Sequence, residues 1–115
     1  MDTLACNAFC AAPPPATHAV QWGGADVWKV CGKVFAIQWT DPMRVTFKVS
    51  PMAFEILSEA PGCIPAPSMA SRGIKWIQWL GPQTLDADAL RDHLTESHRL
   101  VAAGLTKKLR AELGL

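Results

Sequence analysis

The stretch of sequence that decides the fold is VWKVCGKVFAIQW, residues 27–39. Branched and aromatic apolar residues lie on both sides of Cys31-Gly32, which is typical of two strands joined by a two-residue turn. In such a hairpin Val30 faces Lys33 and Trp28 faces Phe35. One face is predicted to belong to the core, with Lys33 at its rim, and it carries Trp28, Val30, Lys33, Phe35, Ile37 and Trp39. The opposite face is half polar and carries Val27, Lys29, Val34, Ala36 and Gln38.

Further strands and helices are predicted on both sides of this hairpin. Alternating or apolar runs predict strands over 18–22, 44–49 and 74–80. Helices are predicted over 4–12, from Ser50 to about Pro61, and over 86–103, with a short terminal helix capped by Thr106. Ser50 is a good N-cap and Pro51 suits the first helical position. The segment 62–73 has two prolines and a glycine at each end, and we predict a long ordered loop there.

The order of these elements predicts the fold class. Short turns join the first four strands, so they should form an antiparallel meander. A helix then precedes the fifth strand, and another follows it. We expect a single α+β domain over residues 1–115, in two layers, with a five-stranded antiparallel meander sheet and helices packed on one face. A chain of 115 residues is large enough to bury its own core.

Composition limits the possible partners. Eleven basic residues against ten acidic ones give a net charge of +1, so no field of the whole chain attracts nucleic acid or anionic lipid. No apolar run approaches the roughly 20 residues of a membrane span. The start carries Asp2 and no basic residue before its short apolar stretch, which does not fit a signal peptide. We therefore expect a cytoplasmic monomer that makes no membrane contact, with its four cysteines reduced.

The sequence contains no convincing catalytic or metal-binding pattern. Cys6 and Cys10 share one face of the first helix, but no second pair of ligands has zinc-site spacing, so buried free thiols are expected. Adjacent helical residues such as Ser97 and His98 point about 100° apart and do not face each other. The glycines match neither phosphate-binding fingerprint. We expect no metal, no cofactor and no enzymatic activity.

Local positive charge is the remaining signal. The residues expected on the solvent side of the sheet are Lys29, Gln38, Arg44, Thr46 and Lys48, and none of them is acidic. Such a surface can neutralise phosphates without reading bases. Scattered cations can equally serve only to keep a half-exposed sheet soluble, and the sequence leaves both explanations open. The candidate nucleic-acid-binding residues are Lys29, Lys33, Arg44, Lys48, Arg72, Lys75, Trp76, Lys107, Lys108 and Arg110. Which of Trp76 and Trp79 faces outward cannot be read from the pattern.

Four segments resemble the MmcQ/YjbR family, in matching order: WGGADVWKVCGKVFA, FKVSPMAFEIL, PGCIPAPSMASRGIKWIQ and LRDHLTESHRLVAAGLTKKLRAELGL. The resemblance covers about residues 9–115. It implies a frataxin-like (CyaY-like) fold and DNA binding through a double-wing motif, a function assigned to that family largely from its fold. One wing would be the hairpin from Lys29 to Lys33, and the segment from Arg72 to Trp76 would be a second basic and aromatic portion. The family implies no catalytic residues.

The chain also departs from the family pattern. The family has Gly-Gly-Lys where this chain has Cys31-Gly32-Lys33, and Leu-Pro-Gly where it has three prolines at 13–15. Cysteine tolerates a positive φ less well than glycine, which affects the turn. Frataxins bind iron through an acidic first helix and strand edge, whereas this first helix region has only Asp2. Iron binding is not expected.

The leading hypothesis is a non-catalytic domain that binds double-stranded DNA weakly, mainly through its backbone. The alternative is a protein- or small-ligand-binding module that uses an apolar groove beside the loop 61–67 and the tryptophans of the last strand. An unrecognised enzyme is a third reading. A continuous basic stripe joining Lys29, Arg44, Lys48 and Lys75 would favour DNA. An exposed tryptophan-lined concavity near 64–69 would favour a ligand.

Overall fold

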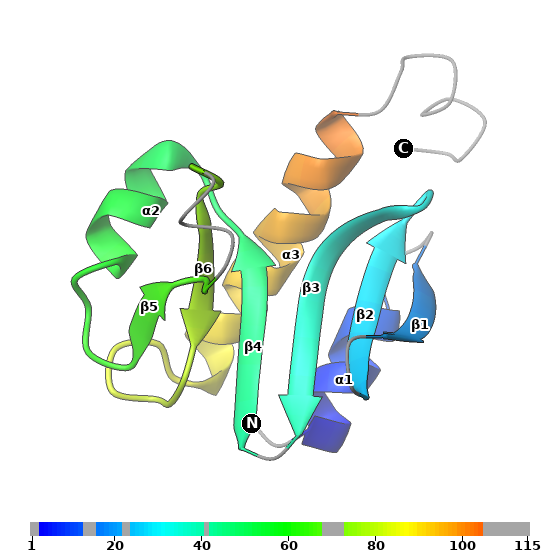
Figure 1. The fold of residues 1–115 in the computed structure, drawn as a ribbon, viewed down its shortest axis with the longest axis horizontal. Helices are drawn as coiled ribbons and strands as arrows, with labels where there is room; N and C mark the ends of the chain where they lie inside the picture. The colour runs from blue at the N-terminus through cyan, green and yellow to red at the C-terminus, as the bar shows by residue number, and fades with distance from the viewer. Residues whose placement is uncertain (1–2, 13–15, 22–23, 41, 68–72, 105–115) are drawn as a thin grey trace.

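The computed structural model describes residues 3–12, 16–21, 24–40, 42–67 and 73–104. These residues form a six-stranded antiparallel sheet in the order β1-β2-β3-β4-β6-β5, with helices beside it (Figure 1). The strands are β1 Thr17–Gln21, β2 Ala25–Val30, β3 Lys33–Thr40, β4 Met43–Lys48, β5 Cys63–Pro65 and β6 Trp76–Trp79. The helices are α1 Thr3–Ala11, α2 Pro51–Leu57 and α3 Ala87–Ala103. The α+β class and the antiparallel meander of the first four strands are confirmed.

The sheet has one strand more than predicted. Residues 63–65 fall in the segment predicted as a loop, but they form β5 and pair with β6 in the register Cys63↔Trp79 to Pro65↔Ile77. Proline cannot donate a ladder hydrogen bond, so a short run that contains Pro65 does not look like a strand in sequence. At the edge of a sheet this deficit costs little, and β5 is the edge strand.

The helix starts follow from their capping residues. The Ser50 side chain accepts a hydrogen bond from the Ala53 amide at 3.2 Å, and Pro51 opens α2 as predicted. At α3 the Asp86 carboxylate accepts from the Ala89 amide at 2.9 Å. The predicted limits of α3 agree with the structure within one residue. The terminal helix predicted from Thr106 lies outside the described residues.

The β2–β3 hairpin contains the expected two-residue turn. Val30 pairs with Lys33, and the two residues between them have positive φ, 49° at Cys31 and 77° at Gly32. Positive φ at both central positions defines the type I′ turn, whose twist matches that of the strands. The cysteine therefore occupies the left-handed conformation that glycine would adopt more easily.

A β-bulge makes one part of the predicted hairpin wrong. Lys29 pairs with Val34, but Trp28 pairs with Ala36, so Phe35 is an extra residue on β3. Phe35 and Ala36 both lie in the cluster beneath the helices. From that point the faces of β3 are the reverse of the prediction. Ile37 and Trp39 lie on the face of the sheet that the helices do not cover, which we call the helix-free face. Ala36 and Gln38 lie on the helix side.

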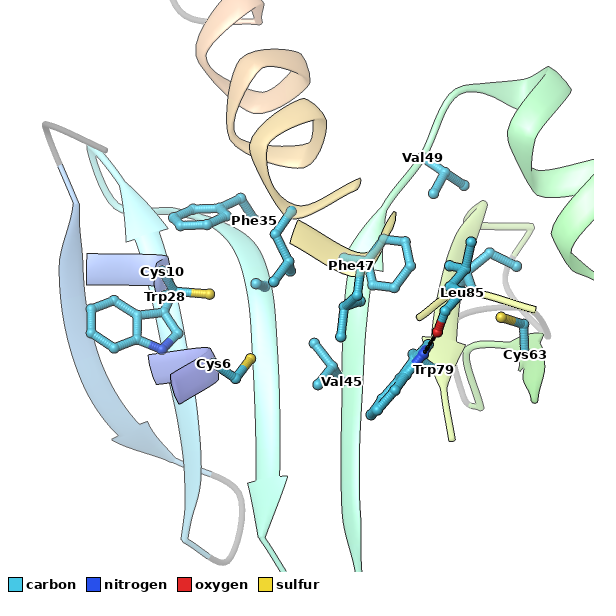
Figure 2. Close-up of a cluster of buried hydrophobic side chains, with 14 of the residues drawn as sticks. Cys6, Cys10, Trp28, Phe35, Val45, Phe47, Val49, Cys63, Trp79 and Leu85 are labelled. Atoms are coloured by element: carbon cyan, nitrogen blue, oxygen red, sulfur yellow. Dashed lines mark hydrogen bonds between the residues drawn. The ribbon is translucent and has the colours of Figure 1, made fainter. Parts of the chain in front are cut away.

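The main core lies between the sheet and the helices (Figure 2). From the sheet it contains Trp28, Val30, Phe35, Ala36, Val45, Phe47, Ile77 and Trp79, and from the helices Cys6, Cys10, Leu57, Leu90, Leu94 and Val101. A second, smaller cluster of Ala25, Val27 and Ile37 lies on the other face, with Val34 and Trp39 packed against it. In Figure 1, α1 and α3 lie behind β2, β3 and β4. Buried apolar side chains therefore lie on both faces of the sheet.

A polar network ties α1 to the first hairpin. Trp28 Nε1 donates to Asn7 Oδ1 at 2.9 Å, and Asn7 Nδ2 donates to Asp26 Oδ2 at 2.9 Å. The second Asp26 oxygen lies 2.7 Å from His18 Nε2, and the His18 ring packs on Trp28 at 4.7 Å between centroids. This chain of contacts places the Asp26 carboxylate on the helix side of the sheet.

Candidate nucleic-acid interface

Three cations among the described residues lie on the helix-free face of the sheet. Cross-strand partners point to the same face, and Arg44 pairs with Trp39 while Lys48 pairs with Trp76. On β2, Trp28 and Val30 point to the helix side. Side chains alternate along a strand, so Lys29, which lies between them, points to the helix-free face. We call this set the cationic face: Lys29, Arg44 and Lys48, with Trp39 and Trp76. Each of its side chains is partly exposed.

Arg44 is held in place by two contacts. Its guanidinium carbon lies 4.8 Å from the centroid of the Trp39 ring, within the range of a cation–π interaction. Its Nη1 also donates to the carbonyl oxygen of Pro42 at 3.1 Å. Trp39 in turn packs against the cluster of Val27 and Ile37. The guanidinium is thereby held in one orientation, and its planar fork of donors matches the oxygens of a phosphate or a carboxylate.

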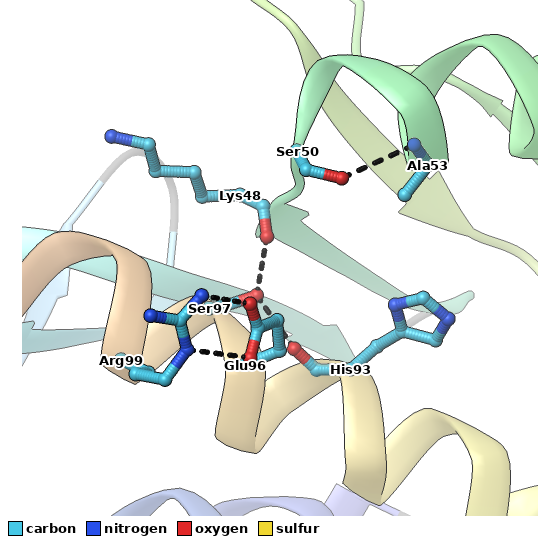
Figure 3. A network of polar contacts seen from close by, with 7 residues as sticks. All are labelled: Lys48, Ser50, Ala53, His93, Glu96, Ser97 and Arg99. Atoms are coloured by element: carbon cyan, nitrogen blue, oxygen red, sulfur yellow. Dashed lines mark hydrogen bonds and ion pairs between the residues drawn. The ribbon is translucent and has the colours of Figure 1, made fainter.

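Lys48 and Trp76 form a second pairing of a cation with an aromatic residue, at the opposite end of β4. The Lys48 carbonyl accepts a hydrogen bond of 2.6 Å from Ser97 on α3, and its side chain extends away from that contact (Figure 3). Trp76 is half-buried, whereas Trp79 is buried and its Nε1 donates to the Leu85 carbonyl at 2.9 Å (Figure 2). The outward tryptophan of β6 is therefore Trp76. The alternative of a ligand groove lined by both tryptophans of this strand is therefore not supported, because Trp79 is buried in the core.

The centre of the cationic face is uncharged. Val27 and Ile37 are buried there, and so are Thr46 and Gln78, with Gln78 Nε2 donating to Thr46 Oγ1 at 3.1 Å. Arg44 and Lys48 are four residues apart on β4, about 13 Å at the usual rise of a strand. The cations thus surround a neutral centre. They do not form the continuous basic stripe of Lys29, Arg44, Lys48 and Lys75 that would have favoured DNA.

Acidic side chains of the described residues gather on the other side of the molecule. The α3 helix and its cap carry Asp86, Asp88, Asp92 and Glu96 against Arg91 and Arg99, which is four acids against two bases and a net charge of −2. Both arginines are paired, Arg91 with Asp88 at 2.8 Å and Arg99 with Glu96. The hydrogen bond from Arg99 holds the pKa of Glu96 below its usual value. No ion pair within the described part of the chain uses Lys29, Arg44 or Lys48.

The structure does not bring all ten predicted site residues together. Lys33 pairs with Val30, which points to the helix side, so Lys33 leaves the sheet away from Lys29. Lys75 is exposed just before β6. Arg72, Lys107, Lys108 and Arg110 lie outside the described residues. Gln38, predicted on the solvent side, is buried opposite Val45 on the helix side because of the bulge.

One feature of the site was missed by the sequence prediction. Trp39 was assigned to the core, and its stacking with Arg44 was not foreseen. A usable signal exists, because Thr40 pairs with Met43 across a two-residue connection at 41–42. Counting outward from that connection places Trp39 opposite Arg44.

The residues considered for catalysis or metal binding lie buried in the protein. Ser97 is buried and its hydroxyl lies within hydrogen-bond distance of two backbone carbonyls, those of Lys48 and His93. The His98 ring packs edge-on against Phe35, at 5.1 Å between ring centroids. Cys6 and Cys10 are buried in the core. Across the described ranges, no group of three or more His, Cys, Asp or Glu side chains is arranged to hold a metal ion. Among the helices that the structure describes, none has the length and apolar character needed to cross a bilayer.

Comparison with known proteins identifies the family and the fold. The YjbR family model matches residues 11–100. A crystal structure of a Deinococcus radiodurans protein with a DUF419 domain is similar with a TM-score of 0.84 and 27% identity, over 99% of this chain and 88% of that one. A Pseudomonas syringae protein shares the fold with a TM-score of 0.70 and 19% identity, over 88% of this chain and 99% of that one. No curated protein matches the sequence. The family match spans most of the chain, and the fold is that of a DUF419 protein: the chain belongs to the YjbR family.

Proposed function

We propose that this YjbR-family domain is a non-catalytic protein that binds DNA weakly, through the phosphate backbone, with its cationic face. The observation that carries the proposal is the separation of charge across the sheet. Lys29, Arg44 and Lys48 lie on the helix-free face, where no described strand position is acidic. The described acids lie in α2 and the turn after it, in α3 and its cap, and at Asp26 on the helix side.

The number of cations sets the strength expected of this interaction. Each phosphate that a protein neutralises on duplex DNA releases counterions and adds about −0.9 to the slope of log affinity against log salt. Three contacts therefore predict a slope of about −2.7, which is a modest electrostatic interaction. Such contacts position a protein on DNA and carry no sequence information. We expect similar affinity for duplexes of different sequence.

The first test is fluorescence anisotropy of a labelled random-sequence duplex titrated with the protein. Between about 50 and 200 mM salt, three phosphate contacts predict a loss of affinity of roughly 40-fold. Affinity that does not change with salt would contradict binding through phosphates. An absence of binding at the lower salt, up to high protein concentration, would contradict the proposed function as a whole.

A charge-matched pair of double variants tests which face is used. Arg44→Gln with Lys48→Gln removes two cations from the cationic face and should reduce the salt slope by about 2 for every sequence alike. Arg91→Gln with Arg99→Gln removes the same charge from α3 and should leave the slope unchanged. Circular dichroism checks that both variants fold. An equal loss in both pairs would show that net charge, and not this face, determines the binding.

A further inference from the structure

We infer that the preferred ligand of the cationic face is single-stranded DNA, whose bases stack on Trp76 and against the guanidinium of Arg44. This inference rests on the proposed function, because it names the form of DNA that the same face accepts. Its evidence is the pairing of cations with aromatic rings at both ends of β4. Arg44 lies over Trp39 at 4.8 Å, and Lys48 is the register partner of Trp76.

A stacking surface needs a flat group that is open on one side. Trp76 is half-buried on the helix-free face and its register partner there is Lys48, so a phosphate bound at Lys48 lies close to a base on Trp76. At the other end, Trp39 packs against the buried cluster and carries Arg44 on top. The planar Arg44 guanidinium is then the outermost layer. Bases stack on arginine planes as well as on aromatic rings, and this stacking does not depend on sequence.

The charge of the face favours a single strand over a duplex. A duplex keeps its bases stacked inside and offers this face only phosphates, for which it has three cations around an uncharged centre of Val27, Ile37 and Thr46. The major groove admits a helix or a two-stranded ribbon, whereas this face is the surface of a six-stranded sheet and no described helix lies on it (Figure 1). A single strand can turn its bases toward the sheet. The bases then lie on Trp76, on the plane of the Arg44 guanidinium and over the uncharged centre, and the phosphates meet Lys29 and Lys48.

The spacing fits a short run of nucleotides. Arg44 and Lys48 are about 13 Å apart along β4, and β3 and β6 lie on either side of that strand at about 4.8 Å each. Trp39 and Trp76 are therefore on opposite sides of β4 and at opposite ends of it. A strand that crosses the face diagonally would contact both pairings. An oligomer of about 12 nucleotides, within the range covered by single-strand-binding domains, is long enough to span them.

Three probes of equal length separate this inference from the proposed function. They are an oligothymidylate of about 12 nucleotides, a base-free deoxyribose phosphate oligomer of the same length, and a duplex of the same length. With the unmodified protein at low salt, the oligothymidylate should bind about tenfold tighter than either of the other two. If the base-free oligomer or the duplex binds as tightly, the inference is wrong while phosphate binding by this face stands. If none of the three binds, the proposed function fails and the inference fails with it.

A variant localises the stacking to Trp76. Trp76→Leu keeps an apolar side chain on β6 and should weaken oligothymidylate binding about tenfold, while binding of the duplex changes little. Met52→Ala is the matched control, because Met52 is 74% exposed on α2, which packs beside β5 and β6 and not on this face. It should leave both affinities unchanged. Oligothymidylate affinity that is unchanged in a folded Trp76→Leu protein would contradict stacking at this residue.

Discussion

The Ser97 hydroxyl oxygen lies 2.6 Å from the carbonyl oxygen of Lys48 and fastens α3 to the end of β4 (Figure 3). The same hydroxyl lies 2.8 Å from the His93 carbonyl one turn earlier in the helix. Ser97 is fully buried, so water cannot replace this contact. β4 carries two of the three cations of the cationic face, Arg44 near one end and Lys48 at the other. The contact with Ser97 therefore holds this strand in position against α3.

Removing this hydroxyl should destabilise the protein. Ser97→Ala leaves the Lys48 carbonyl without its donor, and we expect the free energy of unfolding to fall by about 1–2 kcal/mol. Urea denaturation measures the change. Thr95→Ala is the matched control, because the exposed Thr95 hydroxyl also donates to a carbonyl one turn earlier, that of Arg91, at 3.1 Å. A loss in Ser97→Ala no larger than that in Thr95→Ala would show that the contact with β4 contributes nothing.

The turn residue Cys31 should be improvable. Its φ of 49° is the left-handed conformation, which costs most residues roughly 1 kcal/mol but which asparagine tolerates. Asn-Gly is a preferred pair for the type I′ turn that Cys31 and Gly32 form. Cys31→Asn should therefore raise the free energy of unfolding by up to about 1 kcal/mol. Cys31→Val should lower it, because β-branched residues fit this conformation worst. If the valine variant is as stable as the asparagine variant, the turn does not hold this conformation in solution.

Stability should depend on pH through His93. This side chain is half-buried against Phe47, at 5.7 Å between ring centroids, and burial lowers its pKa from the ordinary value of 6.5. In the window between the two values the unfolded chain binds more protons at this position than the folded one, so stability falls as the pH is lowered from 7. His93→Asn should reduce the loss in urea midpoint between about pH 7.5 and pH 5.5. An identical loss in the variant would assign the pH dependence to other groups.

The four cysteines should differ sharply in reactivity. Cys31 is exposed, whereas Cys6, Cys10 and Cys63 have exposed fractions of 0%, 1% and 4%. A hydrogen bond to Cys6 and burial raise the pKa of the Cys10 thiol, and burial raises that of Cys63. The hydrogen bond from Cys10 lowers the pKa of Cys6, but Cys6 has no exposed surface that a reagent could reach. Because the thiolate is the reactive form, alkylation of the native protein should modify Cys31 alone, as read by mass spectrometry. In Cys31→Ser the native protein should take up no label, and denaturant should expose the other three. Rapid native labelling of Cys6 or Cys10 would mean that α1 opens.

Local chemistry explains which parts of this fold were predictable. Ser50-Pro51 and Asp86 mark helix starts by side-chain and backbone rules that act over three or four residues, and both starts were predicted correctly. The turn at Cys31-Gly32 was found in the same way. The errors arose where pairing between distant segments decides the structure. β5 is a strand because β6 lies beside it, and no residue in Cys63–Pro65 requires that conformation alone.

The same reasoning applies to the candidate site. Lys29, Arg44 and Lys48 were expected on the solvent side, and their strand positions agree, because simple alternation places them. The outward position of Trp39 was not predicted, because counting from the turn at Cys31-Gly32 crosses the bulge at Phe35, whereas counting back from the connection at 41–42 does not. The choice between Trp76 and Trp79 depends on which of them reaches Leu85, a contact made only in the folded protein.

The bulge at Phe35 also determines how this hairpin can change in length during evolution. Loss of Phe35 would leave a regular ladder with every other pair intact, so Trp39 would stay opposite Arg44, but the core would lose one of its largest buried side chains. Insertion of a residue between Ala36 and Trp39, without a second bulge, would instead exchange the two faces of β3. A change of length here therefore either removes a large core side chain or exchanges the faces of the strand, so we expect the number of residues between the two turns of β3 to be constant among related chains.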